Sequence, residues 1–166
     1  MSRVLISSIT QLCTADHSDD AEAIAAWTRN KSPLGLVEML SNAELSMLVA
    51  ERDGSVVGVS AFNRDGQIQL NYIAPSARGS GVSSALLAYM EAELVTLGYA
   101  IATLEATATA LAFYERRGWH VNGPQATGRR VNGYPMSKTL SSSSPYSAFC
   151  KCTMSCQRSN LYPTAL

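Results

Sequence analysis

Three strand-like runs joined by Asp-Gly pairs restrict the fold of this chain more than any other feature of its sequence. They are separated by Asp53 with Gly54 and by Asp65 with Gly66. Asp-Gly between two such runs is a strong signal for a tight hairpin. We therefore predict an antiparallel meander, whose strands are LSMLVAER, SVVGVSAFN and QIQLNYIA at residues 45–52, 55–63 and 67–74.

A helix and a further strand follow the meander. Apolar residues three and four apart place one continuous stripe on one side of a helix, and they are Val82, Ala85, Leu86, Tyr89, Met90, Leu94 and Leu97. Gly98 then ends the helix in the manner of a C-cap, and YAIATLEA at residues 99–106 is typical of a strand. A strand, a helix and a strand in this order imply a right-handed crossover with a parallel neighbour.

The remaining elements complete one domain. A first helix is predicted in DHSDDAEAIAAWTRN and a shorter one in SPLGLVEML. A last helix is predicted in TATALAFYERRGW, with Thr107 or Thr109 as its N-cap and Gly118 as its stop. Short strands are expected at 119–122 and 134–140. The predicted fold class is a single α/β domain (an α+β mixed sheet) over residues 1–140, with helices on both faces of the sheet.

Residues 141–166 differ in character from the domain before them. A run of serines opens this segment, and Cys150, Cys152 and Cys156 lie within it. Because the segment has no periodic apolar face, we interpret it as an appended, disordered tail. A cysteine metal site would need a fourth ligand nearby, and the histidines of the chain are His17 and His120. We therefore predict no metal site.

The charge balance excludes several classes of partner. The chain has 13 Lys and Arg residues and 13 Asp and Glu residues, so it has no broad electrostatic attraction for nucleic acid or for an anionic membrane. No apolar run approaches a membrane span, and MSRVLISSIT is too short and too broken by serines for a signal-peptide core. We expect a cytoplasmic protein in which any anion site is local.

The turn before the striped helix is a candidate anion site. Gly79 and Gly81 allow the backbone to curl so that successive amide N–H groups point outward at the positive end of a helix. Arg78 adds a permanent cation beside them. Small hydroxyl donors are also available, on Ser80, Ser83 and Ser84. The sequence therefore predicts a phosphate cradle at this turn.

A glycine-rich turn before a helix has other interpretations. A P-loop is excluded because no Gly-Lys-Ser or Gly-Lys-Thr is present. A Rossmann-type dinucleotide site would use Glu105, at the end of the next strand, as its ribose-binding acid. Against it, Ser84 occupies the third glycine position, the preceding strand belongs to a meander, and no further strand and helix units follow Gly118. A glycine-rich helix start without any ligand also stays open.

Two stretches together, NYIAPSARGSGVSSALL and ATATALAFYERRGW, resemble the GCN5-related N-acetyltransferase (GNAT) superfamily. The family hallmark is Arg or Gln, two residues, Gly, one residue, then Gly or Ala. It falls here on Arg78, Gly81 and Ser83, so a serine stands at its last position. A second landmark is met by Ala110, Phe113 and Tyr114, with Thr107 where the family has Asn. The resemblance covers about residues 3–140 and implies acetyl-CoA as co-substrate.

The resemblance implies where acetyl-CoA lies and which groups act on it. The strands ending at Ile73 and Ala106 splay apart, the pantetheine arm lies between them, and the pyrophosphate meets the turn. An amide near Ile73 polarises the thioester, and Tyr114 protonates the departing thiolate. The predicted cofactor-binding residues are Ile73, Arg78, Gly79, Ser80, Gly81, Val82, Ser83, Ser84, Thr107 and Tyr114.

The acceptor is less constrained by the sequence. Glu105, at the end of a central strand, is the candidate base that deprotonates an incoming amine, directly or through a water. Arg116 and Arg117 are interpreted as a solvated helix end. We expect transfer of an acetyl group to a primary amine, of a small molecule or a peptide, in a ternary complex. A homodimer and a non-catalytic acyl-CoA-binding module remain open.

Overall fold

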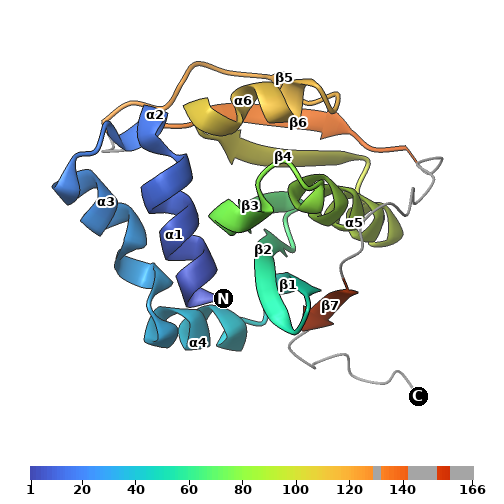
Figure 1. Ribbon diagram of the computed structural model, residues 1–166. Coiled ribbons are helices and arrows are strands. Elements are labelled where there is room, and N and C mark those ends of the chain that lie inside the picture. The colour runs from blue at the N-terminus through green and yellow to red at the C-terminus, as the bar shows by residue number, and fades with distance from the viewer. Residues whose placement is uncertain (129–131, 142–152, 158–166) are drawn as a thin grey trace.

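The computed structural model describes residues 1–128, 132–141 and 153–157, the last of these as backbone only. Its centre is a seven-stranded mixed sheet with the order β5-β6-β4-β3-β2-β1-β7 (Figure 1). The strands are β1 (Leu45–Arg52), β2 (Ser55–Asn63), β3 (Gln67–Ile73), β4 (Ile101–Ala106), β5 (His120–Val121), β6 (Tyr134–Thr139) and β7 (Thr153–Gln157). The mixed α/β class predicted from the sequence is confirmed.

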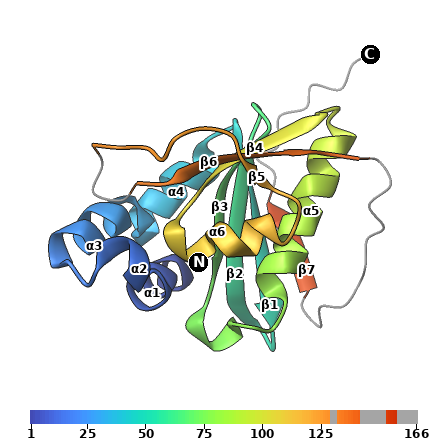
Figure 2. The same ribbon diagram turned by 90° about the horizontal axis from the view of Figure 1, so that it is seen from above.

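Helices cover both faces of the sheet, as predicted. α1 packs on β2 and β3, α4 packs on β1, and α5 lies across the opposite face (Figure 2). α6 packs on β4 and meets α2. The helices are α1 (Ser2–Leu12), α2 (Thr14–His17), α3 (Ala21–Thr28), α4 (Pro33–Ser41), α5 (Val82–Thr96) and α6 (Ala108–Glu115), with short 3-10 turns at Arg29–Lys31 and Pro75–Ala77.

The meander forms as the Asp-Gly pairs predict. β1 pairs antiparallel with β2, and β2 with β3. Asp53 and Gly54 both adopt the left-handed conformation, with φ of 51° and 70°. This conformation suits Gly and is tolerated by Asp. The turn therefore sets the pairing beside it, Arg52 with Ser55, and a register shift follows between Glu51 and Ala50.

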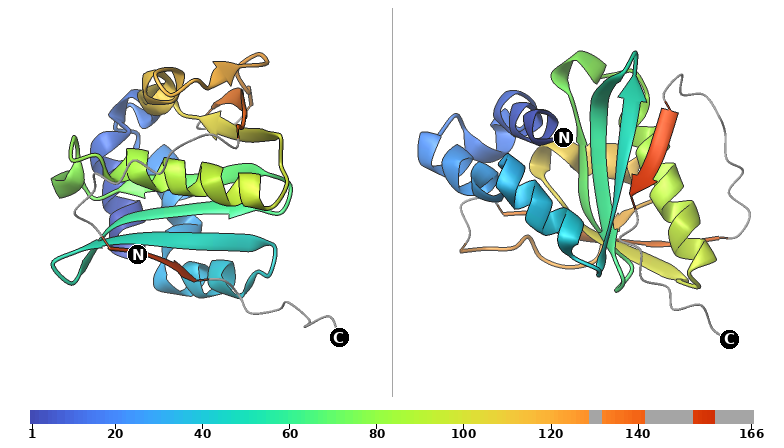
Figure 3. Two further views of the ribbon diagram at one scale, coloured as in Figure 1. Left: turned by 90° about the vertical axis from the view of Figure 1, so that its right-hand side faces the viewer. Right: turned by 90° about the horizontal axis from the view of Figure 1, so that it is seen from below.

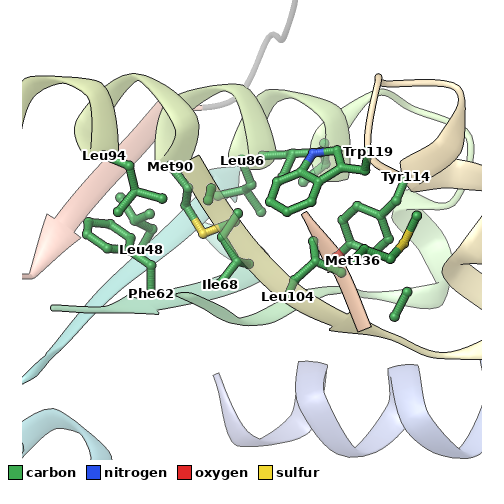
Figure 4. Packing of buried hydrophobic residues seen from close by; sticks show 14 of the residues in the cluster. Leu48, Phe62, Ile68, Leu86, Met90, Leu94, Leu104, Tyr114, Trp119 and Met136 are labelled. Carbon is green, nitrogen blue, oxygen red and sulfur yellow. The ribbon is translucent and has the colours of Figure 1, made fainter. Parts of the chain in front are cut away.

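The α5 face holds the larger apolar cluster. Val82, Leu86, Met90 and Leu94 of the predicted stripe are almost fully buried. Figure 4 shows Leu86, Met90 and Leu94 pointing from the helix toward the sheet. Leu97 departs from the prediction because α5 ends at Thr96, and its side chain is 45% exposed. The other face has a cluster of its own, built on residues such as Leu5, Met47 and Val59.

β3 and β4 are joined over a very short length. They pair in parallel at Gln67 with Thr103 and at Ile68 with Leu104. β3 continues to Ile73 and β4 continues to Ala106, but the two strands do not pair with each other beyond those two pairs. They therefore diverge. This divergence is the splay that the family resemblance implied.

The N-terminal segment differs from the sequence prediction. α1 was not predicted, although Val4, Leu5 and Ile9 recur at helical spacing and are buried. The helix predicted over 16–30 is divided into α2 and α3. The break falls at Ser18 and Asp19, which both have positive φ. Among the described helices, none combines the length and the apolar character needed to cross a membrane.

Part of the segment interpreted as a disordered tail is a strand. β7 pairs antiparallel with β1 from Met47 to Glu51 and occupies that edge of the sheet (Figure 3, right). Cys150 and Cys152 lie outside the described residues, and the domain boundary at Leu140 stays a prediction. Within the described ranges, no group of three His, Cys, Asp or Glu residues is placed to hold a metal ion.

Candidate active site

A cavity of about 510 Å³ opens where β3 and β4 diverge. Its walls come from both strands, the glycine turn, α6 and the end of α1. Most of the residues singled out in the sequence line it, namely Ile73, Arg78, Gly79, Gly81, Ser83, Ser84, Glu105, Thr107 and Tyr114. Residues from distant parts of the chain are therefore brought to one site.

Two of the predicted cofactor-binding residues do not line the cavity. The hydroxyl of Ser80 donates to the carbonyl oxygen of Ala77 at 2.6 Å. The side chain of Val82 is buried in the core at 1% exposure. A binding role for these two residues therefore stays a prediction and would rest on their backbone groups.

The glycine turn presents open backbone at the start of α5. Gly79 and Gly81 have φ of 74° and 85°, and a Cβ atom at either position would meet nothing within 4 Å. Gly81 is the N-cap of α5, and no side chain caps this helix start. The first amides of a helix have no intrahelical partner, and the helix dipole makes them attractive to an anion. The exposed Arg78 stands beside them.

Arg117 lies against this turn, which differs from its interpretation as part of a solvated helix end. Its guanidinium donates to the hydroxyl of Ser84 and, at 2.8 Å, to the carbonyl oxygen of Phe113. The guanidinium also lies over the Phe113 ring, with its Cζ atom 3.8 Å from the ring centre. Arg117 is half-buried, whereas Arg116 is exposed, and both line the cavity. The cavity therefore has cationic side chains at the end near the glycine turn, on Arg78, Arg116 and Arg117.

Ile73 turns its backbone toward the cavity. The N–H of Ala74 donates to the carbonyl oxygen of Val57 on β2 at 2.8 Å. Successive residues of a strand present their backbone groups to opposite sides. The N–H of Ile73 therefore faces β4, on the side where β3 and β4 have separated.

Tyr114 combines a packed ring with a polar hydroxyl. The ring meets Phe113 and Trp119 edge to face, with centroids 5.0 and 5.9 Å away, and the residue is 7% exposed. The side chain of Asn71, which lines the same cavity, lies close enough to affect this hydroxyl. Burial raises the pKa of Tyr114 to about 12, against the opposing effects of Asn71 and Arg117. The phenol is therefore protonated at neutral pH.

Glu105 lies at the rim of the cavity rather than among apolar neighbours. It is exposed, and its carboxylate accepts from the N–H of Gly133 at 3.1 Å. Its role as a base stays a prediction. Thr107 is the N-cap of α6, and its hydroxyl oxygen accepts from the N–H of Ala110 at 3.2 Å.

Asp16 holds the start of α6 in place beside this site, a role that the sequence did not reveal, and it does not itself line the cavity. Its carboxylate accepts from the N–H of Ala108 at 2.6 Å, and from both the N–H and the hydroxyl of Thr109 at 3.2 and 2.6 Å. It thus joins α2 to the start of α6, which carries Tyr114. No local pattern predicts this contact, because about 92 residues separate the partners.

Asp16→Ala is expected to lower the free energy of unfolding by about 1–3 kcal/mol, since it removes three hydrogen bonds at a helix N-terminus. Urea unfolding measures this change. Asp16→Asn keeps one acceptor oxygen and should lose less. An unchanged midpoint in Asp16→Ala would show that α2 and α6 are held together by other contacts.

Buried proton donors make the protein sensitive to alkali. Burial, followed by the charge of Asp16, raises the pKa of the Cys13 thiol from 9.0 to about 12. Burial raises the pKa of Tyr72 as well as that of Tyr114. These groups keep their protons in the folded chain after the unfolded chain has lost them. Stability is therefore full below their unfolded pKa values and falls as pH rises through the alkaline range.

The free energy of unfolding is expected to fall by about 1.4 kcal/mol per pH unit for each such group, from pH 9.0 upward for Cys13 and from pH 10.0 upward for Tyr72 and Tyr114. Urea titrations at stepped pH give this slope. Cys13→Ala should make the slope shallower from pH 9.0 upward. The same slope in wild type and Cys13→Ala would mean that the thiol is not shielded in solution.

Comparisons with known proteins agree with this geometry. A family model described as an acetyltransferase (GNAT) domain matches residues 13–140. The "IAA acetyltransferase" of Azospirillum brasilense is 31% identical over 96 residues, which are 53% of this chain and 63% of that protein. The chain therefore spans less than two thirds of that relative's length.

Solved structures share the fold. A GCN5-related N-acetyltransferase from Rhodopseudomonas palustris superposes with a TM-score of 0.74 at 24% identity, over 84% of this chain and 87% of that one. The PaiA N-acetyltransferase of Thermoplasma acidophilum, solved with coenzyme A, gives 0.69 at 19% identity, over 83% and 89%. Since the family model covers most of the sequence and the fold agrees, the chain belongs to the GNAT acetyltransferase family.

Proposed function

We propose that this protein transfers the acetyl group of acetyl-CoA to a primary amine by direct attack within a ternary complex. The observation that carries the proposal is the cavity between β3 and β4. It has the uncapped start of α5 at one end and the hydroxyl-bearing Tyr114 in its wall. The alternative of a Rossmann-type site is disfavoured because β3 belongs to an antiparallel meander.

The residues present fit coenzyme A. Gly79 and Gly81 leave room for a phosphate to approach the backbone, and Arg78 supplies charge beside them. The divergence of β3 and β4 leaves space for a narrow chain such as pantetheine. The similar PaiA protein was solved with coenzyme A, which supports this choice of cofactor.

The reaction needs an uncharged amine and a stabilised carbonyl oxygen. An alkylamine has a pKa of about 10.4, so it must lose a proton before it attacks. Glu105 takes this proton at the rim, directly or through a water. As the nitrogen bonds to the thioester carbon, the N–H of Ile73 donates to the oxygen that gains negative charge. A donor held in place before the reaction costs no reorganisation at that moment.

Tyr114 acts on the sulfur as the carbon–sulfur bond breaks. A thiol has a pKa of about 8.5, well below the value of about 12 for Tyr114. Full proton transfer to the thiolate is therefore uphill, and the phenol serves first as a hydrogen-bond donor to the growing charge on sulfur. The amine supplies the net proton, so that the products are an N-acetyl amide and free CoA thiol.

The acceptor is a small-molecule or peptide amine. It approaches from the side of the cavity lined by Ser8, Leu12 and Cys13 of the N-terminal segment and by Glu105. The thiol of Cys13 keeps its proton because burial raises its pKa to about 12, so it serves as a wall rather than a nucleophile.

Two measurements test the proposal. Calorimetry should detect binding of acetyl-CoA, and a panel of amine classes should give CoA thiol release for at least one class. If NADH binds and acetyl-CoA does not, the site is a dinucleotide site. If CoA binds tightly and no amine releases thiol, the protein is a non-catalytic acyl-CoA-binding module.

A further inference from the structure

Asn71, near the end of β3, lies where four elements meet. The hydroxyl of Ser60 on β2 donates to its Oδ1 at 3.2 Å. Its Nδ2 donates to the carbonyl oxygen of Ser83, in the first turn of α5, at 3.3 Å. The phenol of Tyr114, on α6, lies beside it in the same cavity. No feature of the sequence singled out Asn71, yet it lines the cavity two residues before Ile73.

The chemistry of an amide decides how these partners are shared. A side-chain amide has one oxygen that accepts and one nitrogen that carries two hydrogens. The carbonyl oxygen of Ser83 can only accept, so it must face Nδ2 and orients the whole group. Oδ1 accepts a hydrogen bond from the hydroxyl of Ser60, and Ser60 is fully buried. One N–H of Nδ2 remains for the phenol oxygen.

We propose that Asn71 is a positioning residue for Tyr114, because its amide donates to the phenol oxygen and leaves the phenol hydrogen directed into the cavity. This inference rests on the proposed function, in which that hydrogen meets the departing sulfur. The same donor stabilises negative charge on the phenol oxygen as its hydrogen moves away.

Few other groups near Tyr114 could orient its hydroxyl. Burial is the main effect on the pKa of Tyr114 and raises it, whereas the hydrogen bond from Asn71 and the charge of Arg117 lower it. Tyr72 is a further titratable neighbour. Arg117 is held by Ser84 and Phe113. Among these groups, Asn71 is the one whose amide keeps an N–H for the phenol oxygen after its bonds to Ser60 and Ser83 are made.

A double-mutant cycle with Tyr114→Phe tests the inference. Asn71→Leu preserves the approximate size and removes both donors and the acceptor. It should lower kcat about tenfold, with KM for the amine and the affinity for acetyl-CoA nearly unchanged. In the Tyr114→Phe background the same substitution should have little further effect on kcat. An equal loss in both backgrounds would overturn the inference, since Asn71 would then act through the α5 turn.

A second variant guards against misfolding of the first, and a spectroscopic readout adds a test that is independent of turnover. Asn71→Asp retains the acceptor for Ser60 and loses both N–H donors, so it should lower kcat at least as much as Asn71→Leu. Asn71→Asp replaces Asn71→Leu in the test if circular dichroism shows that Asn71→Leu does not fold. With carbon-13 tyrosine, the Cζ resonance of Tyr114 should shift in either variant. An unmoved resonance would overturn the inference.

The outcome separates this inference from the proposed function. If Tyr114→Phe keeps wild-type turnover, the acid role of Tyr114 fails, whatever the resonance shows. If Tyr114→Phe loses turnover while both Asn71 variants keep it, the acid role stands and the positioning role of Asn71 is overturned.

Discussion

Gly81→Glu is expected to weaken acetyl-CoA binding by about a hundredfold or more while the chain stays folded. The substitution places a carboxylate at the N-cap of α5, where a phosphate would approach the backbone. Loss of two charge-assisted hydrogen bonds, at about 1.5–3 kcal/mol each, accounts for this size. Calorimetry measures the affinity, and thermal unfolding checks the fold.

Gly98→Glu is the matched control for this substitution. Gly98 follows the other end of α5, also has a positive φ of 90°, and would meet nothing within 4 Å if it carried a Cβ. Both variants therefore bear the same backbone strain and the same added charge, and only Gly81→Glu bears it at the phosphate end. Normal affinity in Gly81→Glu, or an equal loss in Gly98→Glu, would contradict the cradle.

Tyr114→Phe is expected to lower kcat by at least an order of magnitude, with acetyl-CoA affinity little changed. The substitution keeps the ring against Phe113 and Trp119 and removes only the hydroxyl. Acid catalysis by a positioned side chain contributes about a hundredfold to ten-thousandfold. Steady-state kinetics on an identified amine, together with calorimetry, separates kcat from binding.

Tyr89→Phe, on α5, is the control because Tyr89 belongs to the apolar stripe and does not line the cavity. It should keep the wild-type kcat. If both variants turn over at the wild-type rate, Tyr114 is a packing residue and the thiolate leaves unaided or through water. If Tyr114→Phe weakens acetyl-CoA binding and leaves kcat alone, its hydroxyl orients the sulfur in the ground state.

The meander and the glycine turn before α5 could be predicted because their signals are local. An Asp-Gly pair encodes its own turn, and the strand-like runs predicted at 45–52 and 55–63 match β1 and β2 to the residue. The glycine turn likewise needs only positive φ and an adjoining helix, both of which follow from a few neighbouring residues. Such features depend little on the rest of the fold.

The contacts that assemble the site could not be predicted in the same way. Asp16 reaches α6 across about 92 residues, and its role depends on how two helices dock. Asn71 looks like any polar residue of a strand until β2, α5 and α6 surround it. α1 was overlooked because its serines interrupt the apolar pattern, and β7 because its pairing depends on a free edge of β1.

Because β3 and β4 are joined by two residue pairs, backbone pairing alone does not set the width of the cleft between them. The packing of the core sets it as well. Beyond Leu104, packing under α5 holds the two halves of the sheet together, with Ile68, Leu86 and Trp119 in one buried layer (Figure 4). A substitution that shrinks this layer alters the angle between the half-sheets as well as the free energy of unfolding. A change in stability made in this layer is therefore expected to come with a change in the width of the cleft.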